Sequence, residues 1–417
     1  MTLRLRVISP CFLLLATACT DTGPTAGSDD ELVARAEAIH DAVTTIDSHD
    51  DIPFNFASPA VDPLNADRQV NLEKMRAGGL DAAFFIVYVG QTERTPENYA
   101  RAQADAMTKF DAIHRMADEM YPELIEIAYS ADDVERIRSA GKLVAAIGIE
   151  NGYVIGQDLA LLERYHELGA RYITLAHGGH NDIADSSQPR PQFGDEESEH
   201  DGISAFGAEV IEEMNRLGIM VDVSHISKGA ALDAISLSWA PVIASHSNAH
   251  AVAAHYRNMD DDAMLALRDN GGVMQTVALD IFVKVPVPEK NAARDALWAE
   301  FGLAPGNGPN TLAPEQRAQY EERWAEIADR WPGATVEDFV DQIDYSVDLI
   351  GIDHVGISSD FDGGGGITGW QDAADTFNVT LELVRRGYSQ AEIEQLWGGN
   401  LLRVWREVEA VAAATVN

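Results

Sequence analysis

One short segment decides the fold class. It reads Thr44-Thr45-Ile46-Asp47-Ser48-His49-Asp50-Asp51-Ile52-Pro53. Its β-branched start predicts a strand over residues 44–48, and polar side chains follow that strand directly. An open doubly wound sheet that binds nucleotides needs a glycine fingerprint after its first strand, and this segment contains no glycine. The segment therefore favours a closed α/β architecture, the (β/α)8 barrel of the TIM type.

The alternation of short β-rich runs with longer amphipathic stretches recurs along the chain. Strands are predicted at 44–48, 82–88, 144–149, 172–176, 220–224, 242–245, 273–278 and 355–359. Helices are predicted at 71–77, 100–120, 159–168, 205–217, 261–269, 373–386 and 390–412. Segment 285–340 is long, charged and rich in Pro and Gly, with a helical piece near 314–329. We expect a single catalytic domain over residues 41–412, with a helical insertion at about 285–340.

The N-terminal region has a different composition. Two arginines precede an apolar run that ends in small residues, which predicts a secretory signal peptide over residues 1–18. Cys19 then stands where a bacterial lipoprotein is lipidated, although Ala16 occupies a position where Leu is usual. Residues 19–40 would form a lipid-anchored tether and lead-in, and the protein would be exported to the periplasm or outer surface of a bacterial membrane. A plain signal peptide without lipidation is the alternative.

The overall charge and the cysteine content exclude several classes of partner and site. The 417 residues include 30 basic and 68 acidic side chains, a formal net charge of −38. Such a surface repels nucleic acid and anionic lipid, so membrane contact is expected only through an N-terminal lipid. The two cysteines are Cys11 and Cys19. Neither lies in the predicted domain, which therefore has no disulfide and no thiolate metal site.

Polar side chains stand at or just past the ends of most predicted strands. They are His49, Asp51, Glu150, His177, His225, His246 and Asp360. In a (β/α)8 barrel the carboxyl ends of the strands converge on one rim, where catalytic residues lie. A single histidine of this kind is more often structural than functional. Because the pattern repeats around the ring, we expect these side chains to form one site.

The residue types predict a pair of metal ions. His49 and Asp51 lie two residues apart in extended chain and therefore share one side. Imidazole and carboxylate suit zinc, and such sites also accept cobalt or manganese. His225 and His246 can supply a second ion from adjacent strands, and Glu150 lies where its two oxygens can bridge both. Two such ions can activate a water molecule and polarise a carbonyl group.

The remaining candidates fit amide hydrolysis. His177 can face the substrate and stabilise the oxyanion. Asp360 can carry a proton from the attacking water to the leaving amine, with Asp362 as a rival for this role. Arg257 can grip a substrate carboxylate in bidentate fashion, or it is simply a surface arginine. The glycine run 363–366 lacks the Lys-Ser/Thr of a phosphate-binding loop and is interpreted as a mobile turn.

With these residues in place, the sequence resembles the membrane (renal) dipeptidase family of binuclear zinc metallopeptidases, as a bacterial member. The resemblance rests on segments 47–53, 148–151, 171–177, 181–182, 184–186, 207–225, 241–247, 257–258, 356–363 and 397–400. It implies a barrel of the metal-dependent hydrolase kind that cleaves dipeptides, including those with a C-terminal D-residue, to free amino acids. It also implies a homodimer.

The resemblance implies a role for each strand-end residue. His49 and Asp51 would bind one zinc ion, His225 and His246 the other, and Glu150 both. His177 and Arg257 would hold the substrate, and Asp360 would handle protons and the substrate amine.

Two other functions compete with this interpretation. A related barrel amidohydrolase would act on another small amide, ester or lactone; enzymes of that kind usually bridge their metals with a carboxylated lysine, and no lysine ends a predicted strand here. A peptide-binding lipoprotein without catalysis would need no set of metal-type ligands on one rim.

Overall fold

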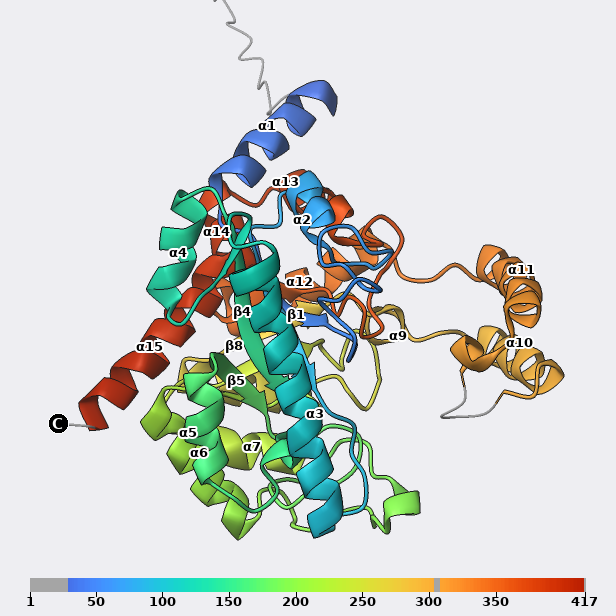
Figure 1. The fold of residues 1–417 in the computed structure, drawn as a ribbon. Helices are drawn as coiled ribbons and strands as arrows, with labels where there is room; N and C mark the ends of the chain where they lie inside the picture. The colour runs from blue at the N-terminus through green and yellow to red at the C-terminus, as the bar shows by residue number, and fades with distance from the viewer. Residues whose placement is uncertain (1–28, 304–307, 416–417) are drawn as a thin grey trace, which may run out of the picture.

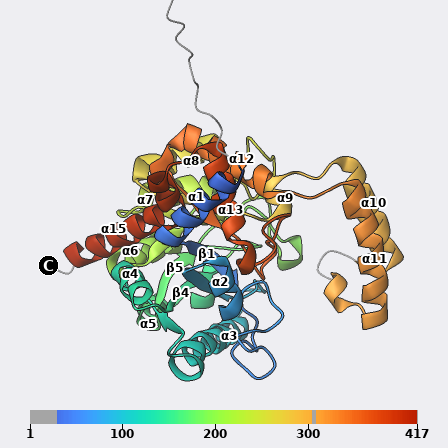
Figure 2. The same cartoon turned by 90° about the horizontal axis from the view of Figure 1, so that it is seen from above.

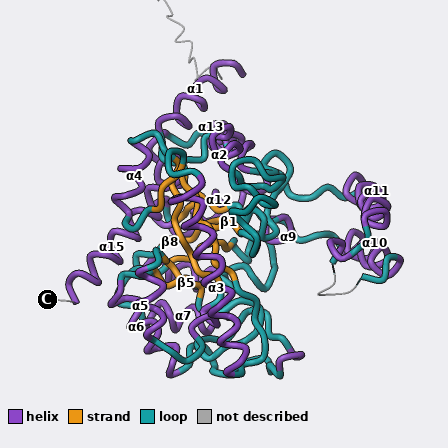
Figure 3. Tube along the Cα trace, viewed as in Figure 1, coloured by secondary structure: helices purple, strands orange, loops and turns teal. Residues whose placement is uncertain are grey.

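The computed structural model describes residues 29–303 and 308–415. A parallel sheet lies in its interior, with helices around it (Figures 1 and 3). Eight strands follow one another around a ring in chain order: β1 (Ile46–Asp51), β2 (Ala82–Tyr88), β4 (Leu143–Glu150), β5 (Ala170–Thr174), β6 (Met220–Asp222), β7 (Ile243–Ser247), β8 (Val273–Val277) and β9 (Val355–Ser358). The amide of Asp51 donates to the carbonyl of Phe361 at 2.9 Å, which joins β1 to the end of β9. The predicted barrel is confirmed.

One strand lies outside this ring and was not predicted. β3 (Ile125–Ile127) pairs in parallel with the start of β4, from Ile125 opposite Leu143 to Ile127 opposite Ala145. A run of three residues is too short for its periodicity to be recognised in the sequence.

The helices pack against the outside of the ring. They are α2 (Leu72–Gly78), α3 (Pro96–His114), α4 (Ala131–Ser139), α5 (Ala160–Glu167), α6 (Ala205–Leu217), α7 (Lys228–Leu237), α8 (Asp261–Asn270), α12 (Val336–Ile350), α13 (Phe377–Arg386) and α14 (Gln390–Glu394). The short α9 (Asp280–Val283) instead follows β8 and contacts α12. The helix ends follow local rules: Ser204 caps α6 by accepting from the amide of Gly207, and Gly218 ends it at φ 81°. Helices α4, α7, α9 and α12 were not predicted.

The two ends of the barrel differ in polarity. Alternate residues of β2 and β4, among them Phe84, Ile86 and Val144, belong to an apolar cluster inside the ring. This cluster lies toward the amino-terminal ends of the strands. The C-terminal helix α15 (Asn400–Thr415) closes the barrel there, and the rings of Trp405 and Phe84 lie 5.7 Å apart. The opposite end, formed by the carboxyl ends of the strands, carries the polar side chains of the predicted site.

Two helices stand away from the barrel. α10 (Pro288–Glu300) and α11 (Pro314–Arg330) form a hairpin that projects to one side (Figures 1 and 2). Leu297, Leu303 and Tyr320 form a small core of its own. The chain returns to the barrel with α12, which begins at Val336 behind a capping box of Thr335 and Asp338.

The N-terminal lead-in is described only in part. Residues 29–42 form helix α1 (Asp29–Ala42), which packs against α13. The predicted signal peptide and Cys19 lie outside the described residues. Within the described ranges, no helix combines the length and apolar character needed to cross a membrane.

Candidate active site

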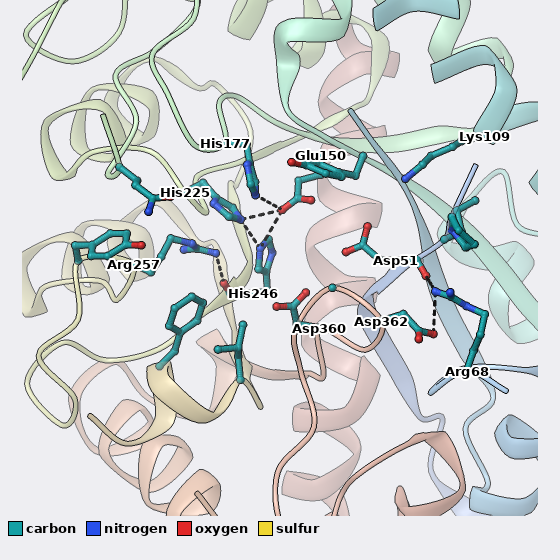
Figure 4. Close-up of a pocket in the computed structure, with 18 residues that line it drawn as sticks. Asp51, Arg68, Lys109, Glu150, His177, His225, His246, Arg257, Asp360 and Asp362 are labelled. Atoms are coloured by element: carbon teal, nitrogen blue, oxygen red, sulfur yellow. Dashed lines mark hydrogen bonds and ion pairs between the residues drawn. The ribbon is translucent and has the colours of Figure 1, made fainter. Parts of the chain in front are cut away.

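The predicted site residues come together at the carboxyl end of the barrel. His49 and Asp51 lie within β1 rather than after it, Glu150 is the last residue of β4, and His246 lies in β7. Most of these side chains line one cavity of about 460 Å³ (Figure 4); they are Asp51, Glu150, His177, His225, His246, Arg257 and Asp360. His49 is fully buried and lies within 4.8 Å of other members of the set.

Backbone strain accompanies two of the site residues. His225 has φ 68° and Asp360 has φ 58°, in the left-handed region that residues other than glycine rarely adopt. Such strain is retained where the surroundings fix it, most often at functional sites. The loop after Asp360 is tight, because the amides of Gly363 and Gly365 donate to the Asp360 carbonyl. The glycine run interpreted as a mobile turn is therefore held by hydrogen bonds.

Gly363 also allows two carboxylates to approach the loop. A Cβ on Gly363 would lie 2.3 Å from carboxylate oxygens of both Asp51 and Asp360. Only glycine fits at this position without displacing them.

Glu150 lies at the centre of the site. Its Oε1 is 2.8 Å from Nε2 of His225 and 3.4 Å from Nε2 of His246. Nε2 of His49 and Nε2 of His177 each lie 3.6 Å from the same oxygen. One carboxylate oxygen thus faces imidazoles from both sides of the ring, and the bridging role of Glu150 stays a prediction.

Two of the histidines are held at Nδ1 and turn Nε2 toward Glu150. The hydroxyl of Tyr172 donates to the carbonyl of Ser48, so it accepts from Nδ1 of His49 at 2.9 Å. Nε2 of His49 is then a buried atom without a hydrogen-bond partner among the described residues. This arrangement, in which one ring nitrogen is held and the other is free, is typical of metal-binding histidines.

His246 is held in the same way. Ser245 donates to Asp222 at 2.6 Å, so its hydroxyl accepts from Nδ1 of His246 at 2.7 Å. Nε2 of His246 is left facing Glu150 and His225.

The charges of the site favour a cation at its centre. Burial alone would lower the pKa of His49, but the charges of Glu150, Asp51 and Asp360 outweigh it and raise that pKa to about 9. Burial, reinforced by nearby positive charge, holds the pKa values of His225 and His246 well below the ordinary value. Those two imidazoles are neutral at pH 7, as ligands must be.

The carboxylates are perturbed in opposite directions. Burial tends to raise the pKa of Glu150, but His177 and His49 outweigh it and bring that pKa well below the usual range. Burial raises the pKa of Asp360 well above normal, and the neighbouring charges of Asp51 and Glu150 add to the effect. Two carboxyl groups whose pKa values diverge within one cavity are typical of acid–base chemistry.

The donor set fits divalent metal ions. Three groups of side chains have ligand atoms close enough to share an ion: His49, Glu150 and His246; Glu150, His177 and His225; and His49, Asp51 and Asp360. Imidazole nitrogen and carboxylate oxygen are the donors that zinc and similar ions prefer. His177 and Asp360 lie close enough to serve as ligands too, so their roles next to the five predicted ligands stay predictions.

Arg257 is a buried residue of this cavity, not a surface arginine. Its Nη2 donates to the carbonyl of His246 at 3.0 Å, and its guanidinium lies 5.4 Å from the ring of Phe282. Nε and Nη1 have no hydrogen-bond partner among the described residues. These two nitrogens lie on different edges of the guanidinium, so a bidentate contact to a carboxylate would pair one of them with the second N–H of Nη2.

Sequence reasoning missed part of the cavity wall. Tyr88, Tyr256 and Phe282 supply aromatic surface, while Lys109 and Arg68 add positive charge on the side away from Arg257 (Figure 4). Lys109 could have been found, because it lies on the buried face of α3 between Ala106 and Phe110. Arg68 lies in a loop without regular structure, and nothing in its sequence context marks it.

The fold and this cavity define a class: a barrel hydrolase with histidine and carboxylate metal ligands at the carboxyl ends of its strands. The family follows from comparison with known sequences. The sequence model described as Membrane dipeptidase (Peptidase family M19) matches residues 33–417. The chain belongs to this family.

Relatives and solved structures agree with this assignment. Dipeptidase tcpJ of Claviceps purpurea is 32% identical over 350 residues, which are 83% of this chain and 70% of that protein. The probable dipeptidase PvdM of Pseudomonas aeruginosa superposes with a TM-score of 0.81 at 35% identity, over 92% of this chain and 100% of that chain. Fungal and bacterial proteins both appear, so these relatives do not bear out the expectation of a bacterial member.

A more distant structure shares the fold. A metallo peptidase from Rhodobacter sphaeroides, liganded with a phosphinate mimic of the dipeptide L-Ala-D-Ala, has a TM-score of 0.69 at 21% identity, over 88% of this chain and 99% of that chain. The family and its dipeptidase members identify the chain as a metallopeptidase that hydrolyses dipeptides.

Proposed function

We propose that dipeptide hydrolysis in this chain uses two divalent ions, zinc in the first place. His49 and Asp51 would hold one, His225 and His246 the other, and Glu150 both. The observation that carries the proposal is the position of Glu150 Oε1, which lies within 3.6 Å of Nε2 of histidines from both sides of the ring. When bound, the ions would supply Lewis acidity that activates water and polarises the scissile carbonyl.

The protein's own groups would move the protons. Asp360 faces the cavity beside Asp51 and would take a proton from the attacking water, then pass it to the leaving amine. His177 lies across Glu150 from His49 and would donate to the oxyanion as the carbonyl becomes tetrahedral. The tight loop at Gly363 keeps the Asp360 carboxylate in place, so little reorganisation is needed during the reaction.

Arg257 would fix the direction of the substrate. Its free donors would bind the C-terminal carboxylate, which would place the amide over Glu150 and the substrate amine near Asp360. Dipeptides with a C-terminal D-residue are included among the proposed substrates. The mimic bound by the relative from Rhodobacter sphaeroides, which ends in D-Ala, supports this part.

The setting of the enzyme is also proposed from the sequence. We expect export through residues 1–18, lipidation at Cys19 and attachment to the periplasmic or outer face of a bacterial membrane. We further expect a homodimer and no nucleic-acid partner. Globomycin, which blocks cleavage of lipoprotein signals, should leave the precursor uncleaved, and Cys19→Ser should abolish incorporation of labelled palmitate.

Removal of the metal should abolish the activity. We expect the purified protein to release free amino acids from dipeptides such as Leu-Ala and Leu-D-Ala, since a free amino and a free carboxyl end are both recognised. Prolonged treatment with 1,10-phenanthroline should remove the activity, and added zinc, cobalt or manganese should restore it. Quantification of released amino acids by chromatography measures both steps. Full activity in metal-free protein would contradict the proposal, and retention of intact dipeptide would favour a binding protein.

Replacing the carboxylate clamp should weaken substrate binding selectively. Arg257→Met keeps the length and packing of the side chain against Phe282 but removes both free donors. We expect kcat/KM for Leu-Ala to fall about 10²-fold, because a charge-assisted bidentate contact is lost. The matched substrate is Leu-Ala amide, which lacks the carboxylate and should lose much less. Equal losses on the two substrates would rule out the clamp.

A further inference from the structure

A second positive region lies across the cavity from Arg257. Lys109 and Arg68 line the side formed by Asp51 and Asp362, whereas Arg257 lines the side formed by His225 and His246 (Figure 4). The chain carries a net charge of −38, so cations on two opposite walls of one cavity are not a property of its general composition. The proposed function uses Arg257 and leaves the other two cations unexplained.

Lys109 is a buried cation without a direct partner. Its residue is 3% exposed, yet its ammonium forms no hydrogen bond and no ion pair within 4.0 Å among the described residues, and the charges of Asp51 and Glu150 act on it only from a longer distance. The ammonium lies 5.3 Å from the ring centroid of Phe54 and 5.5 Å from that of Tyr88, which fix its position at the cavity wall. The ammonium therefore keeps its donors free for a further acceptor in the cavity, and an acidic ligand group would supply the direct partner that it lacks.

Arg68 completes the positive wall from a loop. Its Nη2 lies 3.2 Å from Oδ2 of Asp362 and donates to the carbonyl of Asp51 at 3.1 Å. Asp362 is fixed in turn, because it accepts from the amides of Gln69 and Val70. Arg68 is therefore anchored beside the cavity through one nitrogen, in an orientation set by the loop.

The direction of the substrate decides what reaches this wall. With the C-terminal carboxylate on Arg257 and the amide over Glu150, the N-terminal residue of a dipeptide extends toward Asp51. Its amine is taken by Asp360, which lies between the two positive regions (Figure 4). The side chain of the N-terminal residue is then the part of the substrate nearest Lys109 and Arg68.

We propose that Lys109 and Arg68 form a subsite for an acidic side chain, so that the enzyme prefers dipeptides whose N-terminal residue is Asp or Glu. The inference rests on the proposed function for the direction of the substrate. Lys109 is the stronger determinant, because Arg68 is already paired with Asp362 while the ammonium has no direct partner in the described part of the chain. Isosteric neutral residues at the same position, Asn and Gln, lack the charge that the subsite recognises.

The test compares charged and neutral substrates of the same shape. We measure kcat/KM for Glu-Ala against Gln-Ala and for Asp-Ala against Asn-Ala on the metal-loaded enzyme. In the unmodified protein the acidic member of at least one pair should be favoured about tenfold or more, the scale of one hydrogen bond between charged groups. Lys109→Met should reduce this ratio about tenfold whatever happens to the absolute rates, and Lys109→Arg should keep most of it.

A matched substitution and the pattern of results separate the possible roles. Lys142→Met removes a lysine that pairs with Glu126 away from the cavity and should keep the ratio. If Lys109 served only to balance the charge of Asp51, Lys109→Met would lower kcat/KM equally for all substrates. The ratio of acidic to neutral substrates would then stay unchanged, and this result would overturn the inference. A ratio near one in the unmodified protein would also overturn it while leaving dipeptide hydrolysis intact. Failure to cleave any dipeptide would instead refute the proposed function.

Discussion

Glu150→Gln is expected to reduce kcat/KM for dipeptides by at least about 10³-fold and to lower the metal content of the purified protein. The carboxylate oxygen of Glu150 faces imidazoles from both sides of the ring, so both proposed ions depend on it. A glutamine keeps the shape but carries no charge and offers only one oxygen. Each factor of ten in rate corresponds to about 1.4 kcal/mol, so the loss of several kcal/mol of charge stabilisation in the transition state gives a reduction of about 10³-fold.

The measurement combines steady-state kinetics with metal analysis by mass spectrometry on the same preparation. Glu126→Gln is the matched control, because Glu126 pairs with Arg136 and Lys142 outside the cavity and should change neither quantity. If Glu150→Gln retained two ions per chain and near-normal kcat, the bridging role would be wrong.

Asp360→Asn is expected to lower kcat by about 10²- to 10⁴-fold while two ions remain bound. Asparagine fills the same space beside Gly363 but cannot accept and return a proton, and general acid–base catalysis contributes on this scale. The distinction matters because Asp360 also lies close enough to His49 and Asp51 to serve as a ligand. A fall in metal content that parallels the fall in kcat would assign Asp360 to the metal site instead.

Asp362→Asn is the informative comparison for this variant. Asp362 accepts from the backbone of Gln69 and Val70 and pairs with Arg68, so its interactions are structural. We expect a much smaller loss of kcat than for Asp360→Asn. The reverse order of effects would exchange the roles of the two carboxylates.

The sequence predicted the ring well because its strands are buried and bounded by turns. Every predicted strand overlaps a strand of the barrel, with small shifts at the ends such as β1, which begins at Ile46 and extends to Asp51. What was missed has a physical reason. β3 has three residues, α7 is rich in alanine with weak amphipathic contrast, and α12 was included in part in the expected insertion although it packs on the barrel.

The sequence predicted which residues form the site more completely than it predicted how they are arranged in space. Residue type and position at strand ends were enough to predict that the metal-type ligands come together, because a barrel fixes where the strand ends meet. The burial of Arg257 and its contact with the carbonyl of His246 depend on a loop path that no local pattern encodes. Lys109 reaches the cavity from α3, outside the ring, so a search confined to strand ends could not include it.

Anomalous diffraction at the zinc edge from crystals of the zinc-loaded protein would locate the metal ions on which the proposed reaction depends. We expect two peaks about 3.5–4 Å apart on either side of the Glu150 carboxylate, one near His49 and Asp51 and one near His225 and His246. A single peak, or peaks away from Glu150 in a fully active protein, would contradict the two-metal proposal.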